Sequence, residues 1–149
     1  MARKLRTGIV GATGMVGQRF VTLLADHPWF EVVTVAASER SAGRSYAEAA
    51  GPRWAMATAV PAGIGGLTVK NAANVEEVAG GVDFIFCAVD MPKDETRKLE
   101  DAYARAETPV VSNNSAHRAT PDIPMLLPEV NPEHLAVIPE QRRRLGTTP

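Results

Sequence analysis

Three glycines with a fixed spacing lie close to the start of the chain. Gly11, Gly14 and Gly17 follow the apolar run 5–10 and precede an amphipathic stretch. In a strand–turn–helix unit of this kind, glycine lets the backbone approach phosphate groups, and the helix N-terminus supplies free N–H groups. The motif predicts a site for the pyrophosphate of a dinucleotide. There the Thr13 hydroxyl could donate to a phosphate or cap the helix.

Polar residues at the end of a second apolar run, 30–37, could select the dinucleotide. Ser38, Arg40 and Ser41 offer two hydroxyls and a guanidinium that can hold the 2′-phosphate of NADP. Glu39 competes, because an inward carboxylate would accept a hydrogen bond from the ribose 2′-hydroxyl of NAD. We predict NADP, since Arg40 supplies the charge that a phosphate needs. A surface turn rich in serine and arginine remains the alternative.

The single cysteine of the chain lies in a third apolar run, 82–89. Ligands of such folds bind beyond the carboxyl ends of strands, so we expect Ala88 to line the nicotinamide side of the site. Cys87 itself is flanked by apolar residues, where burial raises the pKa of a thiol, and we predict no nucleophile there. One cysteine excludes an intrachain disulfide and is typical of the reducing cytoplasm.

A second polar cluster, 112–118, follows another short apolar run. Arg118 could hold a phosphate or carboxylate through two hydrogen bonds, with Asn114 beside it; a surface arginine closing a loop is the alternative. His117 could act as a base, although a loop histidine without an identified partner is more often structural. The three histidines have no metal-ligand spacing, and we predict no metal site.

The elements that position these residues alternate between strand and helix. This order predicts an α/β fold, a Rossmann-type doubly wound parallel sheet with right-handed crossovers. The helix after the glycines is expected to bury Val16, Phe20, Leu23 and Leu24. We expect short elements in a loop over 44–66 and an irregular, proline-rich chain after Asn113. The expected strands are 5–10, 30–37, 67–70, 82–89 and 109–112, and the expected helices are 15–26, 74–80 and 92–106.

Length and charge limit the classes of function. The 149 residues fit one dinucleotide-binding domain, 1–149, in which the proline-rich segment 125–149 leads toward a second, missing domain. A net charge of −1 gives no reason to expect nucleic acid as a partner. No apolar run approaches the length of a membrane span, and no signal peptide is expected. The charge run 140–144 is interpreted as a solvated helix end or a tether.

Five segments together resemble one enzyme family, the aspartate-semialdehyde dehydrogenases of the branch found in archaea, fungi and some bacteria. The resemblance covers nearly the whole chain. The matching segments are the glycine motif 11–20, His27-Pro28-Trp29-Phe30, residues 37–43, Ser112-Asn113-Asn114-Ser115-Ala116-His117-Arg118 and Pro128-Glu129-Val130-Asn131-Pro132.

The resemblance implies NADP and a phosphorylated substrate. The family interconverts aspartyl phosphate and aspartate semialdehyde, with release or uptake of phosphate, on the path to lysine, methionine and threonine. By resemblance, Thr13, Gly14, Met15 and Val16 hold the pyrophosphate. Ser38, Arg40 and Ser41 hold the 2′-phosphate, and Asn114 and Arg118 contact the substrate phosphate.

The catalytic residues of the family have no counterpart here. The resemblance places its nucleophilic cysteine, catalytic histidine and substrate-carboxylate arginine beyond residue 149, the latter two in a second domain that also forms the homo-oligomer. Cys87 does not match the family's Asn-Cys motif, so we assign no catalytic residue. We expect the cofactor-binding part of an NADP-dependent aldehyde dehydrogenase, inactive as this chain alone.

Other functions remain open. A non-catalytic NADP-sensing module would share the glycine motif, and N-acetyl-glutamyl-phosphate reductases resemble the chain there. A small reductase or epimerase is disfavoured, because such enzymes commonly pair a tyrosine with a lysine four residues later. Tyr46 is followed at that distance by Ala50, and Tyr103 by Glu107.

Overall fold

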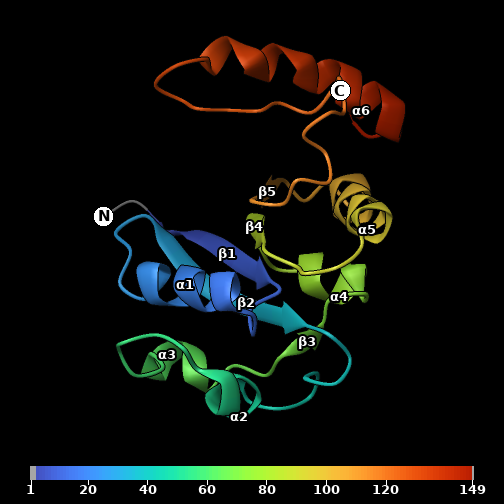
Figure 1. The fold of residues 1–149 in the computed structure, drawn as a ribbon. Coiled ribbons are helices and arrows are strands. Elements are labelled where there is room, and N and C mark those ends of the chain that lie inside the picture. Colours follow the sequence, from blue (N-terminus) through green and yellow to red (C-terminus); the bar gives the residue numbers. More distant parts are fainter. Residues whose placement is uncertain (1–2, 149) are drawn as a thin grey trace.

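A parallel sheet forms the centre of the computed structural model, which describes residues 3–148 (Figure 1). Within these residues the strand order is β3-β2-β1-β4-β5, and every pairing is parallel. Val10 pairs with Ala36 on one side and with Cys87 on the other, so three strands end at the same edge. The strands are β1 (Leu5–Val10), β2 (Phe30–Ala37), β3 (Lys70–Asn71), β4 (Phe84–Cys87) and β5 (Val110–Ser112).

Helices cover both faces of the sheet, which confirms the doubly wound α/β prediction. Successive strand residues point to opposite faces, so neighbours such as Ile9 and Val10 enter different cores. One core packs β1 and β2 against α1 (Met15–Leu24), α2 (Tyr46–Ala50) and α3 (Ala62–Gly65). The other packs β1 and β4 against α4 (Val75–Ala79) and α5 (Lys93–Arg105).

The predicted inner face of α1 is wrong in part. Val16 and Leu23 are 45% and 59% exposed, whereas Val21 and Leu24 are buried. Gly17 sets this orientation, because it packs on the preceding turn. Val21 and Leu24, four and seven residues later, lie on the same side of the helix and therefore face the sheet. Phe20 is partly buried, as expected, and its ring stacks on Phe86 of β4 at 4.7 Å.

The segment between β2 and β3 consists of loops and short elements, as predicted. After α2, a 3₁₀ turn, η1 (Gly51–Arg53), leads toward α3. The predicted strand 67–70 is shifted: β3 begins at Lys70, and Thr68 makes only an isolated antiparallel bridge with Ser45. Pairing with the end of β2, which only the tertiary structure provides, fixes the register of this two-residue strand.

The chain after Asn113 is more regular than predicted. A 3₁₀ helix, η2 (Pro132–Val137), continues into α6 (Ile138–Leu145), which stands apart from the sheet beyond α5 (Figure 1). Proline is tolerated in the first turn of a helix, so Pro139 does not prevent α6 from forming. Gly146 follows α6 with a φ of 70°, the left-handed conformation typical of a helix end. The charge run 140–144 therefore lies on a helix, as one of our two interpretations expected.

Candidate functional site

The glycine turn between β1 and α1 can only be built with glycine at two positions. Gly11 has a φ of +85°, and a Cβ there would lie 2.6 Å from the carbonyl carbon and oxygen of Ala88. A Cβ on Gly17 would lie 2.1 Å from the Gly11 carbonyl oxygen. Gly14 is the N-cap of α1, and no side chain caps the helix there. The first-turn N–H groups of α1 are therefore available to an anion.

Two buried side chains fix the shape of this turn. The Tyr46 hydroxyl, from α2, donates to the Ala12 carbonyl at 2.7 Å, and burial raises the pKa of this tyrosine. The Gln18 amide, 1% exposed, donates to the Thr13 carbonyl at 3.0 Å. Thr13 is buried, and no side chain caps α1, so the capping role that the sequence allowed for the Thr13 hydroxyl is absent from the described residues 3–148. The roles of Tyr46 and Gln18 could not be predicted from the sequence, because their partners are backbone atoms.

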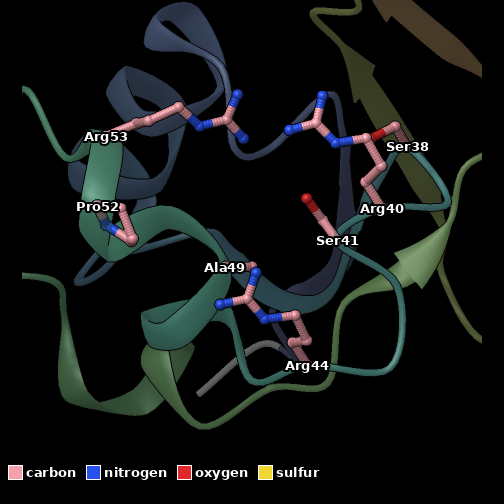
Figure 2. Close-up of a pocket in the computed structure, with 7 residues that line it drawn as sticks. All are labelled: Ser38, Arg40, Ser41, Arg44, Ala49, Pro52 and Arg53. Carbon is pink, nitrogen blue, oxygen red and sulfur yellow. The ribbon is translucent and has the colours of Figure 1, made fainter.

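A hollow of about 270 Å³ lies beside the carboxyl end of β2 (Figure 2). The predicted residues Ser38, Arg40 and Ser41 all line it, together with Arg44, Ala49, Pro52 and Arg53. Glu39, the carboxylate that would favour NAD, is not among these lining residues within 3–148. The hollow thus brings together three guanidinium groups and two serines, a set of groups suited to a phosphate.

The end of β4 lies directly beside the glycine turn. The Ala88 N–H donates to the Val10 carbonyl at 2.8 Å, which puts the Ala88 backbone against Gly11. Cys87 is fully buried, and this burial, with the nearby Glu100 carboxylate, raises the pKa of its thiol to about 12. The prediction that Cys87 is a small buried residue is confirmed.

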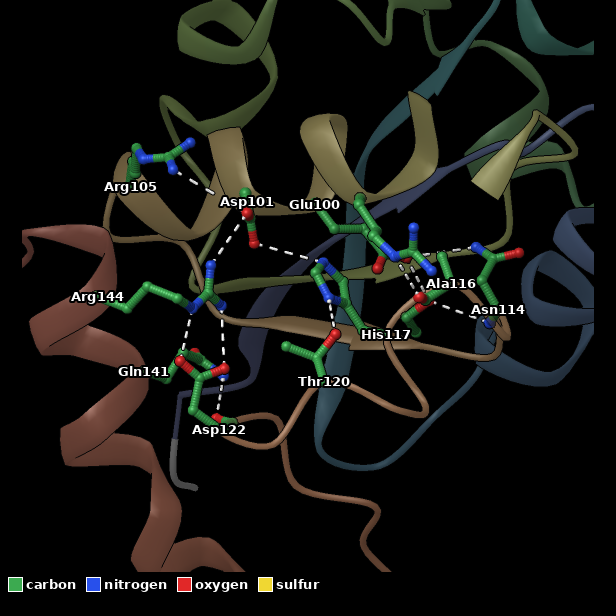
Figure 3. A network of polar contacts seen from close by, with 12 residues as sticks. Glu100, Asp101, Arg105, Asn114, Ala116, His117, Thr120, Asp122, Gln141 and Arg144 are labelled. Carbon is green, nitrogen blue, oxygen red and sulfur yellow. Dashed lines mark hydrogen bonds and ion pairs between the residues drawn. The ribbon is translucent and has the colours of Figure 1, made fainter. Parts of the chain in front are cut away.

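The cluster after β5 lies at the same edge of the sheet. Asn114 is held near the end of β4. Its side-chain amide lies 3.4 Å from a Glu100 carboxylate oxygen (Figure 3). The same amide lies 3.8 Å from the Cys87 sulfur. Ser112 donates to the Glu100 carboxylate. Arg118 is exposed and donates to the Asn113 carbonyl at 3.3 Å. Both predicted substrate residues therefore lie on the loop that follows the last strand.

His117 is part of a buried polar network rather than a free base. Its Nδ1 contacts the Thr120 hydroxyl at 3.0 Å, and its Nε2 lies 3.3 Å from an Asp101 carboxylate oxygen, outside hydrogen-bond geometry (Figure 3). Asp101 also pairs with Arg144 of α6 at 3.2 Å. The structural interpretation of His117 therefore agrees with its surroundings.

Two arginines of the hollow were missed from the sequence. Arg44 and Arg53 come from the segment 44–66, where we predicted short elements in a loop and no site residue, and their approach to Arg40 depends on how α2 and η1 fold back. Among residues 3–148, no cluster of three metal-ligating side chains is present. No helix in this range is both long and apolar enough to cross a membrane.

The comparison with known protein families agrees with this geometry. Residues 6–138 match the family described as "Semialdehyde dehydrogenase, NAD binding domain". The chain belongs to this family. In this chain the glycine turn, the hollow at the end of β2 and the polar loop after β5 lie at one edge of the sheet.

Relatives extend the comparison to whole enzymes. An aspartate-semialdehyde dehydrogenase of Methanothermobacter thermautotrophicus is 44% identical over 142 residues, which are 95% of this chain and 39% of the relative. A malonyl CoA reductase (NADP) of Metallosphaera sedula is 37% identical over 97% of this chain and 38% of its own length. This chain thus spans about two fifths of the length of the curated relatives that it matches.

A relative whose structure was solved with NADP has the same fold. The aspartate-semialdehyde dehydrogenase from Candida albicans, described with NADP, superposes with a TM-score of 0.83 and 34% sequence identity. The match covers 95% of this chain and 38% of that one.

Proposed function

We propose that this domain binds NADP as the cofactor-binding part of an aspartate-semialdehyde dehydrogenase. The observation that carries the proposal is the hollow at the end of β2, where Ser38, Arg40 and Ser41 lie among further positive charge. An adenosine 2′-phosphate gives such a set of groups a partner, whereas the 2′-hydroxyl of NAD does not. The Candida albicans relative, described with NADP, supports the same cofactor.

The rest of the cofactor would follow the glycine turn. In this proposal Gly11 and Gly17 let the backbone approach the pyrophosphate, and Thr13 and the first-turn N–H groups of α1 donate to it. Met15 and Val16 carry such first-turn N–H groups, and Gly14, the N-cap, precedes them with its own N–H donating to the Gly11 carbonyl at 3.3 Å. Ala88 would lie beside the nicotinamide half, because it adjoins the turn at the end of β4.

The proposed reaction is the reductive dephosphorylation of aspartyl phosphate to aspartate semialdehyde. NADPH supplies the hydride when it is bound. Arg118 and Asn114 would orient the substrate phosphate from the loop after β5, with Asn114 held in place by Glu100. We assign no catalytic residue to this chain, because the buried Cys87 thiol stays protonated at neutral pH.

In this proposal the enzyme acts on small molecules, and its homo-oligomer contacts belong to a further domain, such as the family's second domain. The proposed location is the cytoplasm, because a single buried cysteine fits a reducing compartment. The enzyme belongs to lysine, methionine and threonine biosynthesis, as the resemblance implies.

Calorimetric titration of the 149-residue chain with NADPH and with NADH tests the cofactor assignment. We expect NADPH to bind at least about tenfold more tightly, because charge-assisted hydrogen bonds to a phosphate contribute about 1.5–3 kcal/mol. Arg40→Gln should reduce the affinity for NADPH and leave that for NADH within about twofold. Equal affinities, a preference for NADH or no binding of either would contradict the proposal.

A further inference from the structure

Arg53 reaches the hollow from a different part of the chain than Arg40. It is the last residue of η1, twelve or more residues after the serines of the turn. Figure 2 shows the guanidinium groups of Arg53 and Arg40 directed toward one another, with the Ser41 hydroxyl pointing toward the space between them. Two planar donor groups on opposite sides of a gap are an arrangement that suits a phosphate between them.

The residues that line the hollow include no carboxylate to balance its positive charge. They include three arginines, and the ion pairs found within residues 3–148 include none of the three. Arg44 already donates to the Glu48 carbonyl at 2.9 Å. Arg53 is therefore the second guanidinium available beside Arg40, and an anion between them would relieve the repulsion of like charges.

A buried glutamine connects Arg53 to the glycine turn. The Gln18 amide donates to the Arg53 carbonyl at 3.0 Å as well as to the Thr13 carbonyl, and its oxygen accepts from the Ala55 N–H at 2.9 Å. Both N–H groups of this amide therefore donate a hydrogen bond, and its oxygen accepts one. The backbone of Arg53 is thus held at a fixed place relative to the turn that would bind the pyrophosphate.

We propose that Arg53 is a specificity-determining residue that clamps the ribose 2′-phosphate opposite Arg40. The assignment rests on the proposed function, since it names a further partner of the same cofactor. It also explains why an exposed arginine is anchored through a fully buried side chain. NADP would then be selected jointly by the turn after β2 and by η1.

The test compares Arg53→Gln with Lys4→Gln in the 149-residue chain. Both variants remove one exposed positive charge, but Lys4 directly precedes β1, at the opposite edge of the sheet. Calorimetric titrations use NADPH and NADH, and also adenosine 2′,5′-bisphosphate and 5′-AMP, which lack the nicotinamide half. Arg53→Lys keeps the charge and removes the planar fork.

We expect Arg53→Gln to weaken NADPH and adenosine 2′,5′-bisphosphate at least about tenfold and to leave NADH and 5′-AMP within about twofold. Arg53→Lys should lie in between, and Lys4→Gln should resemble the unmodified chain. Unchanged selectivity for NADPH in Arg53→Gln would overturn the Arg53 assignment and leave the proposed function standing. An equal loss for NADPH and NADH would overturn it too, whereas an unmodified chain without NADPH preference would overturn both.

Discussion

Cys87 lies at the end of β4, close to the proposed nicotinamide side of the site, yet its surroundings keep it unreactive. It is fully buried, and the Glu100 carboxylate, which accepts hydrogen bonds from Ser112 and Asn114, adds negative charge nearby. Both effects disfavour a thiolate and raise the pKa of Cys87 from 9.0 to about 12. A cysteine near a cofactor site is therefore not sufficient for nucleophilic chemistry.

The raised pKa of Cys87 predicts how stability depends on pH. The unfolded chain releases the thiol proton above pH 9 and the folded chain only near pH 12, so the free energy of unfolding falls with rising pH between these values. At pH 10 this one group should cost ~1.4 kcal/mol relative to pH 7.5. Urea unfolding of the unmodified chain and of Cys87→Ala at both pH values measures it. Equal losses of stability in the two proteins would refute the prediction.

The glycine turn depends on elements that follow it in the sequence. Tyr46 of α2 and Gln18 of α1 each bind one of its carbonyl groups, so the turn is held from two sides. On the other face of the sheet, Tyr103 of α5 makes a similar contact with the Ala72 carbonyl at 2.6 Å. Two fully buried tyrosines thus have the same type of hydrogen bond, and only one of them contacts the proposed cofactor site.

This pair allows a matched prediction. Tyr46→Phe and Tyr103→Phe should each lower the free energy of unfolding by about 1–3 kcal/mol, because each leaves a buried carbonyl without its donor. Only Tyr46→Phe should also weaken NADPH binding, since it releases the glycine turn. Denaturant unfolding and calorimetry report the two effects separately. Equal NADPH affinities of the two variants would show that the hydrogen bond to Ala12 does not shape the site.

The C-terminal segment gives the whole molecule an apolar surface. Met125, Leu127, Val130 and Leu135 are between 45% and 73% exposed. Ion pairs of Arg142 with Glu107 and of Arg144 with Asp101 and Asp122 attach α6 to the rest of the molecule. Partly exposed ion pairs contribute about 0–1 kcal/mol each, so this attachment is weak compared with the two cores.

We expect the chain to self-associate through this apolar surface. Leu127→Glu should reduce association, whereas Leu23→Glu on α1 should not, although the two leucines are 61% and 59% exposed. The difference arises because Leu127 belongs to the C-terminal segment, in which Met125, Val130 and Leu135 are also exposed. Sedimentation velocity over a range of concentrations measures the effect. A concentration-independent monomer for the unmodified chain would contradict the expectation.

The sequence by itself determined the features that depend on local physics. Apolar runs specified β1 and β2 to the residue, and the glycine spacing specified the turn, since a positive φ and close backbone contact require glycine there. The serines and Arg40 at the end of β2 indicated one wall of the hollow. Each of these signals lies within a few consecutive residues.

Only the tertiary structure decided the features that join distant parts of the chain. It selected the inner face of α1 through the contact of Gly17 with the turn, and it placed η2 and α6 in a segment where prolines suggested irregular structure. It also brought Arg53 opposite Arg40 by way of Gln18. Composition and periodicity report which residues favour burial or turns. They do not report which distant backbone will approach, because long-range packing determines that approach.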